Sequence, residues 1–433
     1  MQVEHDVAIL RAADVATEPV ASAERIRDRY LSIRAFTEKL CESLVAEDYV
    51  IQAMPDVSPT KWHLAHTSWF FETFVLVAHQ PNYQRFHPKF AYLFNSYYVQ
   101  AGDRWARPHR GLLSRPTVAE IYQYRAHVDA RLAQFLTEAP QNVIDEVASI
   151  IEIGLNHEQQ HQELLLTDLK YNLSINPLAP VYREKKASNY AAGPCTWQRF
   201  EEGLYEIGHR GGGFAFDNEG PRHRHFLNAF ELASRPVTNA EYMAFIDDGG
   251  YENPVLWLSL GWATVDEHRW NHPLYWNRDG ETWLNYTLSG LREVDPEEPA
   301  CHLSYFEADA FARWAGARLP TEQEWEIAAG PVTDSGNFVE KGHFHPISAF
   351  GEGLKQCYGD VWEWTQSSYG AYPGYYPAPG AIGEYNGKFM CNQYVLRGGS
   401  CATPASHIRR TYRNFFPPKA RWQFSGIRLA RET

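Results

Sequence analysis

Apolar residues recur every three to four positions through residues 22–175, the spacing expected when one face of a helix is buried. The pattern predicts four helices, over residues 22–46, 59–79, 117–137 and 141–171. Ser58 is expected to be the N-cap of the second helix, with Pro59 as its first residue. Thr117 and Glu120 form a capping box before the third. Four helices joined by one long connection, residues 80–116, predict a helical bundle.

The pattern changes to short strands and turns, rich in Gly, Pro and Trp, from residue 196 to residue 433. Further helices are expected after three capping boxes, which are Thr238 with Glu241, Ser304 with Glu307, and Thr321 with Glu324. Gly316 is expected to end the second of these helices, and residues 394–397 to form a strand. Residues 176–195 fit neither pattern and predict a linker. The fold class is therefore two-domain, with a four-helix bundle at 22–175 and an α+β domain at 196–433.

Three histidines of the bundle are expected to lie on buried helix faces. His157 and His161 are four residues apart, so they project from one face of the fourth helix, together with apolar residues. His66 occupies the apolar face of the second helix. A single buried histidine is usually a hydrogen-bonded core residue, but three on two facing helices can converge on one ion. Three imidazoles with open positions suit Fe(II) or Zn(II).

The segment HEQQH at residues 157–161 also matches H-E-x-x-H, the helix motif of zinc metallopeptidases. In that interpretation Glu158 activates a zinc-bound water, and the protein is a hydrolase. The third ligand of a peptidase is expected downstream, whereas His66 lies upstream. A peptidase also leaves the second domain without a role. The zinc hydrolase stays an alternative.

Composition narrows the class of partner. The net charge is −13, and no run of five Lys or Arg residues occurs, which argues against binding to nucleic acid. No apolar stretch approaches the ~18 residues that span a membrane, and the first twenty residues lack a signal-peptide core. The six cysteines form no CxxC pair, so no structural zinc site on thiolates is expected. We expect a cytoplasmic protein that acts on small molecules; a homo-oligomer is compatible with the sequence.

Several motifs resemble those of one enzyme family. SPTKWHLAHTSWFFETFVL and HEQQHQELLLTDL resemble the DinB-like bundle of the iron-dependent hercynine sulfoxide synthases of ergothioneine biosynthesis. RPVTNAEYMAFIDDGGY, GDVWEWTQS and VLRGGS resemble the formylglycine-generating-enzyme-like domain, a relative of C-type lectins. The resemblance implies Fe(II) bound by His66, His157 and His161. It also implies that O₂ drives bond formation between hercynine (N-α-trimethylhistidine) and the sulfur of cysteine or γ-glutamyl-cysteine, giving a sulfoxide. An ovothiol-type enzyme, which attacks C5 of histidine, is a close alternative.

The resemblance also assigns substrate-binding residues. Gln160 and Asn414 are expected to hold hercynine, and Arg107 and Arg110 to bind the carboxylate of the thiol substrate, for which a bidentate guanidinium is suited. One branch of the family has an acidic residue where this chain has Phe416, and that acid would pair with the amine of γ-glutamyl-cysteine. Its replacement favours free cysteine as the thiol.

Sulfoxide formation needs a proton or hydrogen donor, and a tyrosine phenol is suited to that role. Tyr97 and Tyr98, in the long connection, are the candidates; adjacent residues point in opposite directions, so one of them is expected to face the iron. Formylglycine generation itself is not expected. Its copper-binding cysteine pair follows the RGGS motif, whereas this chain has Thr403 and Ile408 there.

Overall fold

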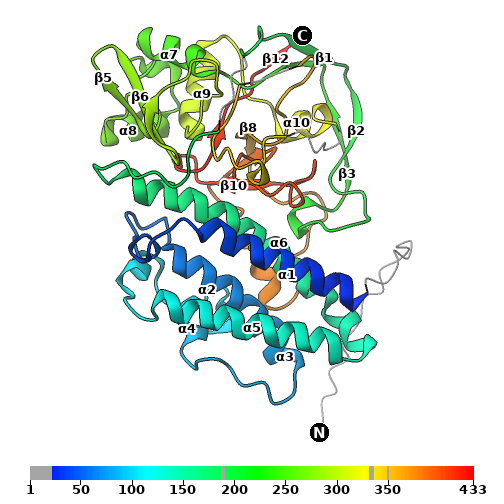
Figure 1. The fold of residues 1–433 in the computed structure, drawn as a ribbon. Coiled ribbons are helices and arrows are strands. Elements are labelled where there is room, and N and C mark those ends of the chain that lie inside the picture. Colours follow the sequence, from blue (N-terminus) through cyan, green and yellow to red (C-terminus); the bar gives the residue numbers. More distant parts are fainter. Residues whose placement is uncertain (1–21, 187–190, 331–335, 349–350) are drawn as a thin grey trace.

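The computed structural model describes residues 22–186, 191–330, 336–348 and 351–433 (Figure 1). It consists of a helical bundle and an α+β domain that packs against one side of it. Residues 1–21, for which we expected no signal peptide, lie outside the described residues. Within the described ranges, no helix is both long and apolar enough to cross a membrane.

The four predicted helices of the bundle are confirmed. They are α1 (Ala23–Cys41), α2 (Thr60–Phe71), α5 (Val118–Glu138) and α6 (Gln141–Ser174). Helices α1 and α2 each pack against both α5 and α6. The helical path of α2 continues through a π-helical turn, η2 (Glu72–Leu76), into α3 (Val77–His79). The long connection is not structureless, because it contains α4 (Phe90–Phe94) and the 3₁₀ turns η3 (Val99–Ala101) and η4 (Arg107–Leu112).

The helix starts follow the predicted caps with one exception. Thr117 and Glu120 form the expected capping box, in which the Thr117 side chain accepts a hydrogen bond from the Glu120 N–H. Ser58 is not the N-cap of α2; Pro59 holds that position. The Ser58 hydroxyl instead accepts from Arg110 Nη1 at 2.8 Å, and the Ser58 N–H donates to Oδ2 of Asp168 at 2.7 Å.

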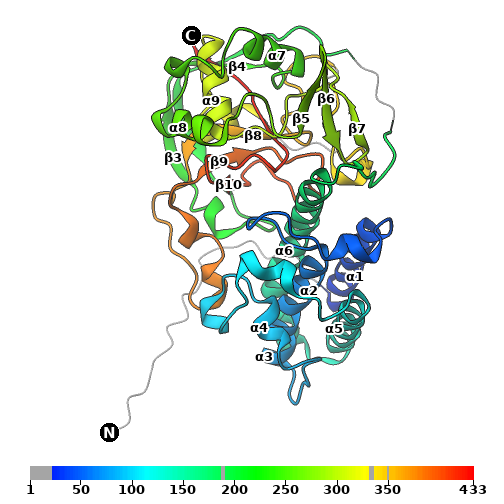
Figure 2. The same cartoon turned by 90° about the vertical axis from the view of Figure 1, so that its left-hand side faces the viewer.

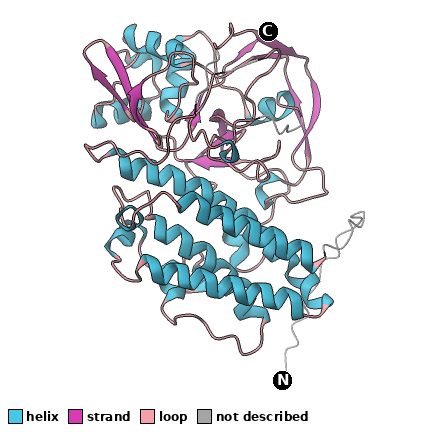
Figure 3. Ribbon diagram, viewed as in Figure 1, coloured by secondary structure: helices cyan, strands magenta, loops and turns pink. Residues whose placement is uncertain are grey.

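The C-terminal domain is built from short strands between long loops (Figure 3). Its central sheet has the order β10-β9-β8-β11, with only β8 and β11 parallel. These strands are β8 (Trp362–Ser368), β9 (Tyr394–Arg397), β10 (Asn414–Phe416) and β11 (Ser425–Gly426). A second sheet, β1-β4-β12, comprises β1 (Trp197–Phe200), β4 (Phe230–Ala233) and β12 (Ala430–Glu432). Two antiparallel units remain, of β2 (Gly203–Ile207) with β3 (His223–Leu227), and of β5 (Trp276–Asp279), β6 (Thr282–Thr287) and β7 (Gly290–Glu293).

The helices of this domain are α7 (Asn239–Asp247), α8 (Ser259–His268), α9 (Tyr305–Trp314) and α10 (Glu322–Ala328). All three predicted capping boxes are confirmed, at the starts of α7, α9 and α10. Gly316 follows the end of α9 with φ of +66°, as expected for a C-terminal glycine. The predicted strand at 394–397 is β9.

Helix α6 joins the two domains (Figure 2). The Glu163 carboxylate is buried and accepts hydrogen bonds from Trp362 Nε1 at 2.5 Å, Ser400 Oγ at 2.8 Å and Thr403 Oγ1 at 2.7 Å. Burial raises the pKa of this carboxyl group, and the three donors oppose that effect. Thr403 stands where a formylglycine-generating enzyme would be expected to have a copper-binding cysteine. Here it helps to hold the C-terminal domain against α6 of the bundle.

Candidate metal centre

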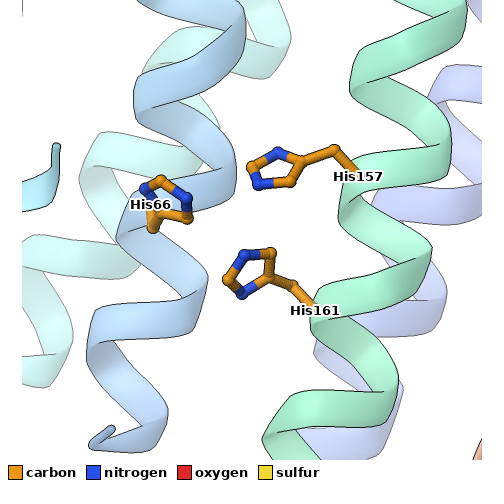
Figure 4. A group of neighbouring side chains, drawn as sticks. All are labelled: His66, His157 and His161. Carbon is orange, nitrogen blue, oxygen red and sulfur yellow. The ribbon is translucent and has the colours of Figure 1, made fainter. Parts of the chain in front are cut away.

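Three buried histidines converge between α2 and α6 (Figure 4). One ring nitrogen of each, from His66, His157 and His161, lies within 4.8 Å of the others. His66 Nε2 and both ring nitrogens of His157 have no hydrogen-bond partner within the described structure. Buried polar atoms without partners are costly, so this arrangement is typical of a site that an ion completes. The predicted convergence of the three side chains is present.

A glycine allows the two helices to come this close. Gly154 lies three residues before His157, on the same face of α6. A Cβ atom there would stand 2.5 Å from Cε1 of Phe71 and 2.9 Å from Cε1 of Phe70, both on α2. A larger residue would therefore require these buried rings, or α6 itself, to shift.

The surroundings keep the three rings neutral and fix one of them firmly. Burial lowers the pKa of all three imidazoles, that of His157 to about 3. The His66 ring is sandwiched between Trp62 and Trp69, with ring centroids at 4.5 and 5.3 Å. Its Nδ1–H donates to the Phe94 carbonyl at 2.6 Å, which leaves Nε2 as the free donor atom. Neutral imidazoles are the form that binds metal, so the residues present fit a divalent transition ion.

Glu158 does not belong to this site. Its carboxylate accepts hydrogen bonds from Arg34 Nη1 at 2.9 Å, Arg125 Nη2 at 3.0 Å and Thr37 Oγ1 at 2.7 Å. These partners, the two arginines above all, outweigh the effect of burial and lower its pKa to about 2. A carboxylate held by two guanidinium groups is a poor general base, so the geometry disfavours the zinc hydrolase suggested by the HEQQH motif.

The two candidate tyrosines occupy different environments. Tyr98 is fully buried, its ring centroid is 5.5 Å from that of Trp69, and its hydroxyl has no partner within the described residues. Tyr97 stacks on Tyr98 at 4.7 Å and is only partly buried. Burial raises the pKa of the Tyr98 phenol well above its ordinary value, so the hydroxyl retains its proton. Tyr98 is therefore the inner member of the pair.

Gln160 lies beside the histidines but contacts the other domain. Its Nε2 donates to Tyr412 Oη at 2.5 Å, and its Oε1 accepts from the hydroxyl of Tyr385. The Tyr385 ring also lies 5.8 Å from that of His157. Tyr385 and Tyr412 were missed by the sequence analysis, because they are 225 and 252 residues away from Gln160. No local pattern marks such partners.

The two candidate arginines also differ. Arg110 is buried, its guanidinium carbon lies 3.3 Å from the centre of the Trp62 ring, and its Nη1 donates to Ser58 Oγ at 2.8 Å. Since Trp62 stacks on His66, Arg110 is connected to the metal centre. Arg107 is exposed and donates to the backbone carbonyl of Asp56. The structure thus brings only Arg110 next to the histidines.

Asn414 and Phe416 lie on β10 and are partly buried. The Asn414 side-chain oxygen accepts from the N–H of Phe415 at 2.9 Å, and the Phe416 ring packs against Trp422 at 5.8 Å. Among the described residues, neither side chain makes a hydrogen bond or ring contact with the three histidines. Their roles in substrate binding stay predictions.

Comparison with known proteins gives a consistent result along the chain. Residues 30–165 match the DinB superfamily, and residues 198–349 and 338–433 match the sulfatase-modifying factor enzyme 1-like domain. A hercynine oxygenase of Mycolicibacterium thermoresistibile is 32% identical, over 87% of this chain and 88% of that protein. A hercynine oxygenase of Mycolicibacterium smegmatis is 31% identical, over 94% and 98%. Ergothioneine biosynthesis protein 1 of Schizosaccharomyces pombe is 26% identical, over 50% of this chain and 28% of its own length.

Proposed function

Because the chain belongs to the hercynine oxygenase family, we propose that it is a non-haem Fe(II) sulfoxide synthase of ergothioneine biosynthesis. It joins C2 of hercynine to the sulfur of a thiol and oxidises that sulfur to a sulfoxide. The imidazole C–H and the thiol S–H are lost, one atom of O₂ enters the sulfoxide, and the other leaves as water. The observation that carries the proposal is the buried cluster of His66, His157 and His161, in which ring nitrogens of His66 and His157 lack partners within the described residues.

Three neutral imidazoles would hold Fe(II) and leave coordination positions open for the thiol and O₂, so that iron supplies the electron transfer. The Tyr98 hydroxyl, buried and protonated, is our candidate proton donor during oxygen reduction. Tyr97, which stacks on it, stays the alternative donor.

Residues around the cluster bind the two substrates. Gln160, together with Tyr385, presents an amide and a phenol next to His157, where both can hydrogen-bond the imidazole of hercynine. Asn414 is assigned to the same substrate by the family resemblance. Arg110, buried beside Trp62, is our candidate for the carboxylate of the thiol, and Arg107 is a weaker second candidate because it is exposed.

We propose free cysteine as the preferred thiol. Phe416 offers no charge for the amine of a γ-glutamyl group, whereas the family branch with an acid at this position does. Free cysteine needs a partner for its own carboxylate, which Arg110 can supply.

Oxygen uptake by the protein loaded anaerobically with Fe(II) tests the proposal. Uptake should require both hercynine and a thiol, and cysteine should give a higher kcat/KM than γ-glutamyl-cysteine. Mass spectrometry and NMR of the product should show a sulfoxide at C2; attachment at C5 would instead identify an ovothiol-type enzyme. His157→Ala should abolish uptake, while His268→Ala, which changes an exposed histidine of the other domain, should not. Absence of O₂ uptake by the wild type with either thiol would refute the function.

A further inference from the structure

A fourth buried histidine lies against the metal centre. His63 precedes His66 by three residues on α2, and its Nδ1 lies 2.9 Å from Nδ1 of His161. Its Nε2 lies 3.1 Å from Oδ2 of Asp168, which is on α6. Both side chains are buried. A chain of three side chains therefore begins at a carboxylate and ends at one of the three converging imidazoles.

The chemistry of these groups sets the direction of the hydrogen bonds. A carboxylate only accepts, so His63 Nε2 carries the proton and donates it to Asp168. His63 Nδ1 then has a lone pair, which accepts from the Nδ1–H of His161. His161 is thereby fixed in the tautomer whose Nε2 lone pair is free for a metal ion.

The far end of the chain is also held. Oδ2 of Asp168 accepts a second hydrogen bond from the Ser58 N–H at 2.7 Å. Ser58 Oγ in turn accepts from Arg110 Nη1 at 2.8 Å. The carboxylate is thus oriented by Ser58, two residues before the start of α2, and Ser58 also contacts the arginine beside the metal centre.

We propose that His63 and Asp168 are positioning residues that fix the ring orientation and the tautomer of His161 for metal binding. Partners of this kind typically change metal affinity by about 10- to 100-fold when they are replaced. His66 obtains the same support from the Phe94 carbonyl, which no side-chain substitution removes. His161 depends on side chains, so its support can be tested by mutation. The inference rests on the proposed function only in requiring that the triad binds a metal.

Titration of the metal-free protein with Co(II), followed by calorimetry and by visible absorption, tests this role. His63→Leu removes the acceptor, and we expect Co(II) binding about 10- to 100-fold weaker, with altered ligand-field bands. His63→Asn places an amide oxygen where Nδ1 stood, so it should retain most of the affinity and the wild-type spectrum. Asp168→Asn should give an intermediate loss. His268→Ala is the matched control and should bind Co(II) as the wild type does.

Thermal unfolding of each metal-free variant shows whether the fold is intact. If His63→Leu does not fold, Asp168→Asn decides the result. Wild-type affinity and an unchanged spectrum in every variant that folds would overturn the positioning role while leaving the proposed function in place. A wild-type protein that binds neither Co(II) nor Fe(II) would refute the proposed function itself.

Discussion

Replacing Glu158 with glutamine distinguishes a structural carboxylate from a catalytic one. In the structure Glu158 is fully buried and its carboxylate pairs with Arg34 and Arg125 rather than with the histidine cluster. We predict that Glu158→Gln lowers the free energy of unfolding by about 3 kcal/mol. It should leave the O₂ consumption of the folded, metal-loaded protein within about two-fold of wild type, because Glu158 is not part of the metal centre. A change of about 1.4 kcal/mol in the activation barrier would instead change the rate ten-fold.

Two independent considerations give this magnitude. The pKa of Glu158 is lowered from 4.5 to about 2, which corresponds to about 3 kcal/mol at about 1.4 kcal/mol per pKa unit. Breaking a buried ion pair by removing one partner costs about 3–5 kcal/mol. The lower end applies because Arg34 keeps Asp129 and Arg125 keeps Glu38 as partners.

The contribution of Glu158 to the free energy of unfolding should depend on pH in a definite direction. Because the pKa of Glu158 is lower in the folded state than in the unfolded chain, its contribution is complete above about pH 4.5. It is lost as the pH falls through about 2. Wild type and Glu158→Gln should therefore differ by a constant amount near neutral pH, and this difference should shrink in acid.

Urea unfolding of the metal-free proteins at several pH values measures the difference. Glu146→Gln is the matched control, because it makes the same chemical change at an exposed position of α6. A change in unfolding free energy below about 0.5 kcal/mol, the range of ordinary surface substitutions, would refute the structural role. Complete loss of turnover in a folded, metal-loaded Glu158→Gln protein would refute its separation from the chemistry.

Four further substitutions or treatments test the site and the contact between the domains. Tyr98→Phe removes a hydroxyl without a partner, so stability should change by less than about 1 kcal/mol, while mass spectrometry should show more thiol sulfinate and less sulfoxide. Arg110→Lys replaces a planar fork by a point charge and should raise the KM for the thiol by about ten-fold or more in steady-state O₂ uptake. Removal of the metal by a chelator should lower the melting temperature, since metal at 100 times its Kd adds about 2.7 kcal/mol to stability. Glu163→Ala removes the acceptor that three buried donors share and should cost about 3 kcal/mol in urea unfolding, and Glu163→Gln less.

Each of these expectations can fail on its own. An unchanged product ratio in Tyr98→Phe would leave Tyr97 as the donor to test. An unchanged KM in Arg110→Lys would move the carboxylate site to Arg107. A melting temperature insensitive to chelation would contradict a metal in the buried cluster. Stability unaffected by Glu163→Ala would mean that other contacts alone hold the domains together.

The features predicted correctly from the sequence depend on local spacing. Residues four apart on a helix share a face in any fold, so His157 and His161 could be paired before the structure was known. The capping boxes depend on side chains three residues apart, and all of them formed. His66 could be grouped with them because it lies on the apolar face of a second helix, which was expected to face the same core. These interactions are set by helix geometry, which tertiary contacts rarely override.

The features missed depend on long-range contacts. Ser58 resembled a helix cap, but its hydroxyl accepts a hydrogen bond from Arg110, 52 residues away. The π-helical turn after α2 leaves no simple mark in the sequence. Arg107 and Arg110 are indistinguishable as an R-x-x-R pair, although packing against Trp62 buries only one of them. Burial and partners of this kind follow from how the domains meet, which local patterns do not encode.

Helix α6 has a consequence for how the two halves of this protein could have evolved. Between Gly154 and Leu173 nearly every side chain is at least largely buried, because one face holds His157 and His161 and another receives Trp362, Ser400 and Thr403. Neither half is a self-contained module: cutting the chain after α6 would leave the Glu163 carboxylate without its donors and Gln160 without its tyrosines. Recombination that exchanged one domain for a homologue would have to bring a matching surface of this single helix with it. The fusion of the two folds is therefore hard to reverse, and loss of either domain should eliminate the whole activity in one step.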